Sequence, residues 1–353
     1  MFGRTVLRGL TVTGKASVLC LVRAQLHVSS RHGLKYGYWA YMLGERTSKL
    51  FGPNSKIITV DGNLASGKGK LAQALAEKLG MKYMPEADQN YVHRITGDGT
   101  ILPDKFAGLS SLEKFYEDPK CPDGNSYRLQ IWLFCARMLQ YSDALDHLLS
   151  TGQGVILERS PFSDYVFLEA MCKSNYIRKE CVNHYNEIKN VSIDEFLPPH
   201  IAIYVDVPAA EVYKKIQEKG NAAEKKVELS YLQNIEDTYK SSFLPLIRET
   251  SEVLQYTASE VQNVEQIAED LEYVKITKAP WTEQNDVTFH HLRLLVQDKF
   301  NVINLFNLPI FIPEVTVGGL EYDKLYYQFR DLPGRKYAKG YNEDIGDKYI
   351  WLK

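Results

Sequence analysis

Cysteine is sparse in this chain of 353 residues, and its spacing excludes the usual cysteine-based sites. The five cysteines stand singly at positions 20, 121, 135, 172 and 181, with no CxxC pair among them. The eight histidines form no HExxH spacing either. We therefore expect no structural zinc site, iron–sulfur cluster or disulfide framework.

Long hydrophobic runs and an excess of one charge are also missing. Near the start of the chain the longest apolar run, Val18 to Val22, ends at Arg23, which is too short for a membrane span. The 42 basic and 44 acidic residues give a net charge of -2, so composition offers no case for nucleic-acid binding. The hydrophobic content of 44% is ordinary for a soluble globular protein, and the length suits one large domain with additions, or two domains.

Acidic residues are missing from the first forty positions, where arginine and lysine recur among serine, threonine, leucine and valine. This pattern is typical of a mitochondrial presequence, and a basic, frayed terminus or a nucleic-acid arm is the alternative. We predict a presequence over residues 1–34 and a linker over residues 35–55. Removing residues 1–34 takes away five basic residues and no acidic ones, which leaves 37 against 44 and a net charge of -7.

The chain between residues 56 and 280 alternates short β-branched runs with helical patterns. One helical pattern ends at Gly80, and a long amphipathic one runs from Ser126 to Leu149. Such alternation predicts an α/β fold with a doubly wound parallel sheet of about five strands. The expected strands are residues 56–61, 82–85, 154–157, 200–207 and 253–256.

A glycine-rich loop follows the first expected strand. Residues 62–69 read GNLASGKG, a GxxxxGK pattern placed between a strand and a helix. Backbone N–H groups of such a loop converge on phosphate oxygens, the helix N-terminus adds a partial positive charge, and Lys68 adds a full one. We therefore expect phosphate binding. The expected contact residues are Gly62, Asn63, Ala65, Ser66, Gly67, Lys68 and Gly69.

Gly69 departs from the nucleotide-binding pattern, which has serine or threonine at this position. The missing hydroxyl normally binds magnesium, the ion that bridges the transferring phosphates, so catalysis should suffer more than binding. Magnesium needs few protein ligands, and a carboxylate elsewhere could still hold it.

Polar residues follow two of the other expected strands. Glu86 comes directly after the second strand, and Glu158 and Arg159 end a buried apolar run. Side chains at the carboxyl ends of parallel strands face the ligand crevice, and charges there are costly unless they are used; a structural ion pair is the alternative. Gln130 and Arg137 lie seven residues apart on the long helix, about 700° of rotation, so they project from nearly the same face.

These motifs, together with FYEDP at residues 115–119 and ERS at 158–160, resemble the deoxyribonucleoside kinase family over about residues 56–275. The resemblance implies a P-loop fold in which Glu86 is the base for the nucleoside 5′-hydroxyl and Arg159 contacts the reacting oxygens. The other roles it implies are base reading by Gln130, Arg137 and Asp164, sugar contacts by Tyr116 and Glu224, and magnesium binding at Glu158.

The lid segment departs from the pattern of that family. Residues 214–226 read KKIQEKGNAAEKK and contain no arginine, whereas the kinases clamp the donor phosphates with several lid arginines. Lys215 and Lys219 stand at two of those places, and Asn221 at a third. Because lysine lacks the bidentate fork of arginine, we expect weaker transition-state stabilisation than in an active kinase.

Residues 281–353, the C-terminal extension, are rich in aromatics, with 13 in 73 residues against 12% for the whole chain. We predict one helix over about residues 287–304 and few regular periods after it. A segment of this composition needs a surface to lie on. We expect the extension to dock on its own domain, on a partner protein, or on both.

The presequence, the altered phosphate side and the aromatic extension together resemble the kinase-like accessory subunits of mitochondrial respiratory complex I, the NADH:ubiquinone oxidoreductase. That resemblance implies a non-catalytic subunit needed for assembly or stability, peripheral on the matrix face of the inner membrane, with the other subunits as partners. It implies a retained pocket for a deoxynucleotide or ATP/ADP, with or without magnesium. FAD is associated with those subunits, but no residue here argues for it. An active mitochondrial deoxyribonucleoside kinase and a nucleotide-sensing pocket are the alternatives.

Overall fold

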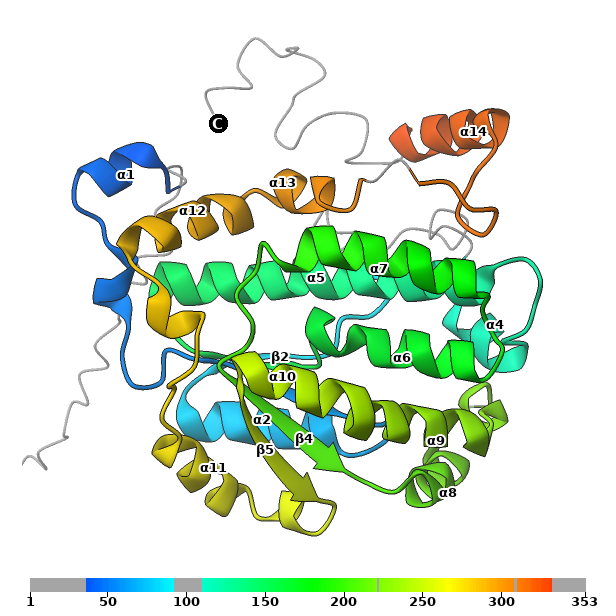
Figure 1. The fold of residues 1–353 in the computed structure, drawn as a ribbon, viewed down its shortest axis with the longest axis horizontal. Coiled ribbons are helices and arrows are strands. Elements are labelled where there is room, and N and C mark those ends of the chain that lie inside the picture. The colour runs from blue at the N-terminus through cyan, green and yellow to red at the C-terminus, as the bar shows by residue number, and fades with distance from the viewer. Residues whose placement is uncertain (1–35, 92–109, 221, 308–309, 332–353) are drawn as a thin grey trace, which may run out of the picture. The chain divides into compact units, whose positions relative to one another are not determined.

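A five-stranded parallel sheet organises the computed structural model, which describes residues 36–91, 110–220, 222–307 and 310–331. In space the strands follow the order β2, β3, β1, β4, β5. Figure 1 labels β2, β4 and β5 among the surrounding helices. Their bounds are β1 Ile57–Gly62, β2 Lys82–Met84, β3 Val155–Glu158, β4 Ile201–Asp206 and β5 Glu252–Thr257. All the pairings are parallel; Ile58, for example, pairs with Ile156 of β3 and with Ile201 of β4. The predicted α/β class is confirmed.

The central strands are mostly apolar because helices cover both faces of the sheet. Every residue of β1 is buried, as are the first five residues of β4. Strands in this position read as continuous hydrophobic runs instead of alternating with polar residues. β1 and β3 are neighbours, and the connections that follow them cross to opposite sides of the sheet, so a ligand crevice opens at their carboxyl ends.

The helices of the sheet domain follow the strands in regular succession. The longer ones are α2 (Lys68–Leu79), α5 (Asn125–Thr151), α6 (Pro161–Lys173), α7 (Lys179–Ile193), α8 (Ala209–Lys219), α9 (Leu229–Thr238) and α11 (Val264–Tyr273). The shorter ones are α4 (Leu112–Glu117), η4 (Glu224–Lys226), η5 (Tyr239–Phe243), α10 (Leu244–Thr250) and η6 (Glu260–Gln262). α2 packs on β1, β2 and β3 and is itself covered by α11, whereas α5 contacts β1, β3 and α6. α2 ends where Gly80 takes a left-handed conformation with φ 64°, a common helix stop.

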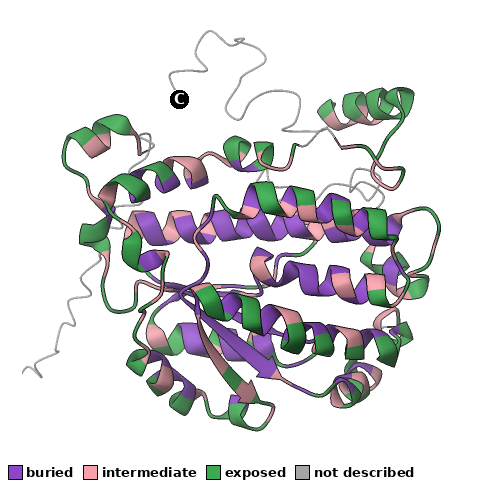
Figure 2. Cartoon of the chain, viewed as in Figure 1, coloured by how far each residue is buried: buried purple, intermediate pink, exposed green. Residues whose placement is uncertain are grey.

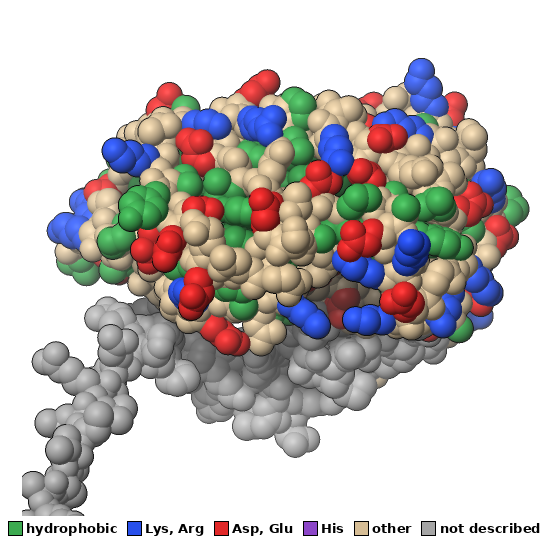
Figure 3. Space-filling view, turned by 90° about the horizontal axis from the view of Figure 1, so that it is seen from below, with side chains coloured by type: hydrophobic (Ala, Val, Ile, Leu, Met, Phe, Trp, Pro, Cys, Tyr) green, Lys and Arg blue, Asp and Glu red, His purple; other side chains and the backbone are tan. Residues whose placement is uncertain are grey.

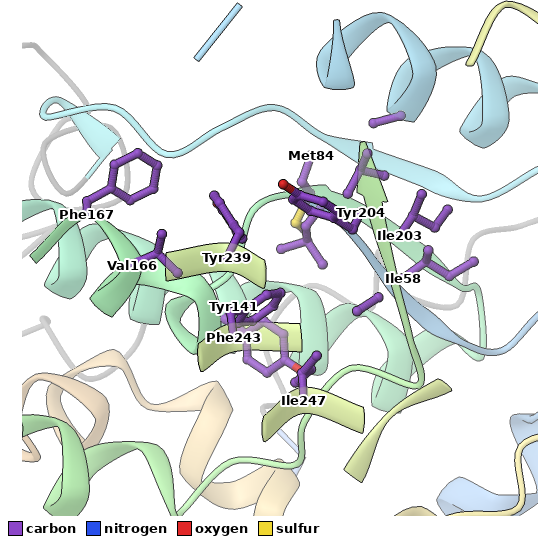
Figure 4. Close-up of a cluster of buried hydrophobic side chains, with 14 of the residues drawn as sticks. Ile58, Met84, Tyr141, Val166, Phe167, Ile203, Tyr204, Tyr239, Phe243 and Ile247 are labelled. Carbon is purple, nitrogen blue, oxygen red and sulfur yellow. The ribbon is translucent and has the colours of Figure 1, made fainter. Parts of the chain in front are cut away.

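Helix α5 is buried on most of its surface (Figure 2). Its Tyr141 belongs to a cluster of buried aromatic side chains that fills the space between the sheet and the helices (Figure 4). In this cluster the ring of Tyr239 lies 5.3 Å from that of Tyr204 on β4 and 5.5 Å from that of Phe243. The hydrophobic core therefore lies next to the crevice and holds its walls in place.

Segments on either side of the sheet domain also pack on α5. The C-terminal ones are α12 (Asp286–Gln297) and α13 (Lys299–Asn304), and the N-terminal one is η2 (Thr47–Leu50). Trp281, in η7 (Trp281–Glu283), donates from its indole nitrogen to the carbonyl of Pro198 at 2.6 Å. A short helix, α1 (Tyr38–Met42), precedes η2 and has no buried residue.

Two expectations for the C-terminal extension are wrong. The single helix expected over residues 287–304 is two helices, because Asp298 leaves the helical conformation with φ -99° and ψ 98°. Its side chain accepts a hydrogen bond from the backbone N–H of Phe300, so Asp298 is the N-cap of α13. The irregular stretch expected after residue 304 contains a regular helix, α14 (Gly319–Arg330), none of whose residues is buried.

Some predictions lie outside the described residues. They concern the presequence over residues 1–34, Asn221 in the lid, and the last residues, 332–353. In the part of the chain that the structure describes, no helix has the length and apolar character of a membrane span.

Candidate functional site

The glycine-rich loop joins β1 to α2 at the carboxyl edge of the sheet. Gly62 has a φ of 155°, and a Cβ at this position would lie 2.9 Å from the carbonyl oxygen of Val205, so only glycine fits. The side-chain amide of Asn63 donates to the carbonyl of Leu232 at 3.0 Å. The loop is thus fixed against β4 and α9, and the first turn of α2 faces the crevice.

Ser66 and Lys68 are buried polar side chains of this loop, as is Asn63. Ala65 and Gly67, on either side of Ser66, take left-handed conformations with φ of 47° and 90°. The hydroxyl of Ser66 has no hydrogen-bond partner in the described chain. The ammonium of Lys68 lies 3.3 Å from a carboxylate oxygen of Glu86. Burial lowers the pKa of Lys68, and the charge of Glu86 opposes that shift.

Three cationic side chains converge on Glu86, which follows β2. Lys68 approaches Oε2, while Arg137, at 3.0 Å, and Arg159 both bind Oε1. Burial alone would raise the pKa of Glu86, but the charges of Arg159, Lys68 and Arg137 outweigh it and hold the pKa well below its usual range. Glu86 is therefore ionised, and in this arrangement it is a weak proton acceptor.

Arg159 reaches Glu86 from the end of β3 in a strained backbone conformation. Its φ of 61° lies in the left-handed region, which residues other than glycine rarely adopt. Its guanidinium donates to the carbonyl of Gly62 at 3.1 Å and lies 4.5 Å from the ring centre of Phe167. These contacts keep the strained conformation and place the charge between the phosphate loop and Glu86.

Asp164 is fully buried in the first turn of α6, behind Arg137. The amide of Gln130 and the hydroxyl of Tyr185 donate to its Oδ2, each at 2.7 Å, and Arg137 donates to its Oδ1. Burial raises the pKa of Asp164, and the charge of Arg137 opposes that shift. The structure thus brings together Gln130, Arg137 and Asp164, the three residues expected to read a base.

A cavity of about 450 Å³ opens beside these charges. Five of the residues that the sequence predicted line it: Glu86, Tyr116, Gln130, Arg137 and Arg159. Sequence reasoning missed most of the apolar walls, which include Leu64, Phe115, Leu129, Phe167, Met171 and Tyr231. In a sequence such residues look like ordinary core positions, so no signal separated them. A largely apolar cavity of this size with a few polar groups at one end suits a nucleoside-sized ligand.

Tyr116 and Glu224 come from two short helices that pack on each other, α4 and η4. Burial, followed by the charge of Glu224, raises the pKa of Tyr116 to about 12. Lys226 of η4 pairs with Glu117 of α4 at 3.1 Å. Tyr116 lines the cavity, whereas Glu224 is not among the described lining residues.

Glu158 ends β3 and lies against Gly69, outside the lining of the cavity. A Cβ at Gly69 would lie 2.7 and 2.8 Å from the two carboxylate oxygens of Glu158, so the carboxylate fills the place of the usual serine or threonine side chain. The hydroxyl of Tyr83, a residue that sequence reasoning missed, donates to Oε1 of Glu158. Among the described residues, no three histidine, cysteine, aspartate or glutamate side chains are grouped to hold a metal ion.

The lid has lysines at two positions where the resemblance to the kinases implied arginines. Lys215 of α8 pairs with Glu211 one turn earlier at 2.8 Å, and Lys219 is exposed at the end of the helix. Each lysine offers a single charged point instead of a planar fork, so a bidentate clamp on phosphate cannot form from these two side chains.

Several buried polar atoms at this edge of the sheet have no hydrogen-bond partner in the described chain. They include the hydroxyl of Ser66 and the Nε atoms of Arg137 and Arg159. Because buried polar groups are nearly always hydrogen-bonded in folded proteins, such a group of atoms marks a place for a ligand or ordered water.

Comparison with known proteins gives the family of the chain. The family model for Deoxynucleoside kinase matches residues 58–278, which include the phosphate loop and the cavity. Deoxyguanosine kinase from Dictyostelium discoideum is 26% identical over 74% of this chain and 85% of its own length. A solved structure of deoxyadenosine kinase from M. mycoides, with dCMP and dCDP bound, has a TM-score of 0.48 and 18% identity, and covers 62% of this chain and 100% of that one.

A nearer relative is similar over almost the whole of both chains. The mitochondrial protein NADH dehydrogenase (ubiquinone) 1 alpha subcomplex subunit 10 from Bos taurus is 58% identical over 93% of this chain and 96% of its own length. The chain therefore belongs to the deoxynucleoside kinase family and, within it, to the group formed by these subunit 10 proteins.

Proposed function

We propose that this chain is a non-catalytic accessory subunit of mitochondrial NADH dehydrogenase (ubiquinone), respiratory complex I, and is needed for the assembly or stability of that complex. One observation carries the proposal. The 58% identity to the bovine subunit covers 93% of the chain, whereas the kinase family model ends at residue 278. The similarity therefore extends to segments that a shared kinase activity would not need to keep.

The residues on the phosphate-transfer side of the pocket support the proposal that the chain does not catalyse phosphate transfer. Gly69 lacks the hydroxyl that would bind magnesium, and the carboxylate of Glu158 lies in its place. The lid offers lysines where a kinase has arginines, and arginines in such roles are worth orders of magnitude in rate. Glu86, the counterpart of the kinase base, is held ionised by three cations.

The nucleoside side of the pocket supports retained binding of a deoxynucleotide or of ATP/ADP. Gln130, Arg137 and Asp164 form one hydrogen-bonded group at the cavity, and unpartnered donors remain beside it. The relatives named deoxyguanosine kinase agree with a purine ligand. Nothing in the described lining calls for FAD. Glu158 is the expected protein ligand for magnesium, and among the described residues it is not grouped with two other metal-binding side chains.

The location that fits this function is the matrix face of the inner membrane, reached by import through the presequence at residues 1–34. The N-terminal residue of the mature chain, read by mass spectrometry from mitochondria, tests the import step. We expect it to lie between Ser29 and Leu34. An intact Met1 in the mitochondrial protein would contradict import by a cleaved presequence.

The partners that fit are other subunits of the complex, contacted in part through the C-terminal extension. Helix α14 has no buried residue, although it carries Leu320, Tyr322, Tyr326 and Tyr327. On the face shown in Figure 3, the basic and acidic side chains of the described residues are interspersed. That face lacks the basic stripe that nucleic-acid binding needs.

The experiment that tests the proposal is a native gel of gently solubilised mitochondrial membranes, probed for this chain and stained for NADH-oxidising activity. We expect the chain to migrate wholly with the large NADH dehydrogenase, and its depletion to lower the amount of assembled complex. Migration as a free monomer or dimer would overturn the proposal.

A kinase assay separates this function from its alternative, an active deoxyribonucleoside kinase. The purified mature chain is incubated with Mg-ATP and with deoxyguanosine or deoxyadenosine, and formation of the monophosphate is followed. We expect no turnover from a folded sample. Turnover that Glu86→Gln abolishes would instead establish the kinase.

A further inference from the structure

The carboxylate of Glu158 lies against the first turn of α2, where a phosphate group would be attracted. The N-terminus of a helix carries a partial positive charge and free N–H groups, which together favour anions. The charge of Glu158 also acts on Lys68, where it helps to keep the pKa from falling further. A negative side chain in this place competes with phosphate for the same positive region.

Tyr83 holds Glu158 in this place from the neighbouring strand. β2 pairs with β3, and the Tyr83 hydroxyl donates to Oε1 of Glu158. A tyrosine hydroxyl is protonated at neutral pH, so it remains the donor in this contact. The other oxygen of the carboxylate lies 2.7 Å from the Cβ position of Gly69, and only a glycine leaves room for it.

The charge of Lys68 is also countered from within the chain, by Glu86 at 3.3 Å. Both positive features of the phosphate side, the start of α2 and the loop lysine, are therefore opposed by a carboxylate of the protein itself. The base-reading side is different, because Gln130 lines the cavity whereas Glu158 does not.

We propose that Tyr83 is a specificity-determining residue of this pocket: by holding Glu158 against Gly69, it weakens the binding of phosphorylated ligands relative to the unphosphorylated nucleoside. The inference rests on the proposed nucleotide pocket. Apparent affinity falls in proportion to the fraction of molecules whose site is open, so a contact that leaves about one fifth of them open weakens binding about fivefold. A nucleoside, which has no phosphate, does not have to displace the carboxylate.

The first test measures the dissociation constants of deoxyguanosine, dGTP, deoxyadenosine and dATP by calorimetry in EDTA, for the wild type and for Tyr83→Phe. The variant keeps the ring and loses only the hydroxyl. We expect triphosphate binding to tighten about fivefold and nucleoside binding to stay unchanged. Glu158→Gln should act in the same direction, since it removes the charge.

A matched control is Tyr256→Phe on β5, the opposite edge strand. It breaks another tyrosine–carboxylate hydrogen bond, from the Tyr256 hydroxyl to Asp270 of α11 at 2.8 Å. It should change neither affinity. The thermal midpoint of each ligand-free variant shows that it is folded. The proposal would be overturned if the ratio of the triphosphate to the nucleoside dissociation constant were the same in the wild type and in Tyr83→Phe.

Two substitutions at Gly69 separate the carboxylate from the missing hydroxyl. In Gly69→Ala the methyl group must push Glu158 away and adds no metal ligand. Gly69→Ser pushes Glu158 away and also adds a hydroxyl that can bind a metal ion. We expect Gly69→Ala to tighten triphosphate binding in EDTA. Tightening in Gly69→Ser alone, and only with magnesium, would show that the hydroxyl sets the affinity, and would overturn the proposal.

The same titrations distinguish this inference from the proposed pocket. If the wild type binds a nucleoside or a triphosphate but Tyr83→Phe leaves their ratio unchanged, only the role of Tyr83 is wrong. If none of the four ligands binds the wild type or any folded variant, the proposed nucleotide pocket is wrong, and the role of Tyr83 with it.

Discussion

Glu86 is the residue on which the charges of the pocket depend. Lys68, Arg137 and Arg159 all contact its carboxylate, and Arg137 also forms an ion pair with Asp164. Without Glu86, three cations would lie close together at the edge of an apolar cavity. Removal of one member of a buried ion pair is costly because the remaining charge stays desolvated.

We expect Glu86→Gln to lower the free energy of unfolding of the ligand-free chain by about 2–4 kcal/mol at pH 7. Added phosphate should restore part of the loss, because an anion bound only by the folded state takes the place of the carboxylate. Chemical unfolding with and without phosphate measures both effects. Glu77→Gln, at an exposed position on α2, is the control and should stay within about 0.5 kcal/mol of the wild type.

The pH dependence of stability, compared between the wild type and Glu86→Gln, tests whether the ion pairs of Glu86 cause this loss. The pKa of Glu86 is held below its ordinary value of 4.5, so its contribution to stability is fully present above pH 4.5. That contribution is lost as the pH falls through the lowered pKa that Glu86 has in the folded state. The stability difference between wild type and Glu86→Gln should therefore shrink below pH 4.5, and a constant difference would contradict the ion-pair account.

The motif positions predicted which residues lie at the pocket, but not what they contact in the ligand-free chain. Glu86 and Arg159 were each expected to meet a ligand, and the structure shows them bound to each other. Tyr83 was not expected at all, because a tyrosine in a strand of three residues is an ordinary half-buried position. Its partner on β3 is known only once the order of the strands is known.

At the scale of elements, His200 joins the sheet to the C-terminal extension. It precedes β4, its Nδ1 accepts the backbone N–H of Ile57 at 2.9 Å, and its ring stacks on that of Trp281 with centroids 3.7 Å apart. Burial, followed by the charge of Lys56, lowers the pKa of His200 to about 3. The imidazole is therefore neutral in the folded protein and accepts a proton when the chain unfolds below its ordinary pKa.

We expect His200 to lower the free energy of unfolding as the pH decreases. Between pH 6.5 and about 3 the unfolded chain binds a proton that the folded chain does not, so this contribution is fully present above pH 6.5 and is lost as the pH decreases. His200→Asn offers a similar acceptor without the charge change. The stability difference between wild type and variant should change by up to about 1.4 kcal/mol per pH unit below pH 6.5. Parallel curves from pH 7.5 to pH 5 would contradict the assignment.

Packing of α12 on α5 gives a second prediction at this scale. Val296 is fully buried on α12, while Val287 on the same helix is 50% exposed. We expect Val296→Ala to lower the free energy of unfolding by about 2–3 kcal/mol in a single transition, and Val287→Ala to change it by less than about 0.5 kcal/mol. Equal small effects, or a separate unfolding step for the extension, would show that α12 is not part of the cooperative core.

Local patterns predicted the elements of the sheet domain better than those of the extension, for a physical reason. The strands and α2 bury apolar residues in a definite period, and a residue such as Gly80 marks where a helix stops. Helix α14 buries nothing within the described chain, so its sequence carries no one-sided period to recognise. The break at Asp298 depends on a single capping bond, which the run of apolar residues around it obscured.

At the scale of the whole molecule, the kinase-type sheet domain is accompanied by aromatic elements that it does not bury. On α1, Tyr38 is 60% and Trp39 is 77% exposed, and on α14, Leu320 is 90% and Tyr327 is 65% exposed. A helix of twelve residues is marginal on its own in water, so α14 gains most of its stability from whatever covers it. In the proposed function, that surface belongs to a neighbouring subunit of the complex.

The last prediction therefore concerns α14. We expect Leu320→Ser with Tyr327→Ser to leave the unfolding free energy of the isolated chain within about 0.5 kcal/mol of the wild type, because neither side chain is buried. After import into mitochondria that lack the endogenous protein, the same double variant should enter the NADH dehydrogenase band of a native gel less than the wild type does. Tyr273→Ser, a tyrosine 84% exposed on α11, is the matched control and should assemble normally.

Each outcome of that experiment gives a different role to the exposed side chains of α14. Loss of assembly with unchanged stability means that α14 is a contact surface, since a folding defect would have lowered both. Normal assembly of the double variant would remove α14 from the interface and would leave α1 and the sheet domain to hold the subunit in place. Equal loss for Tyr273→Ser would mean that any exposed tyrosine matters for import or assembly, and the specific role of α14 would then be wrong.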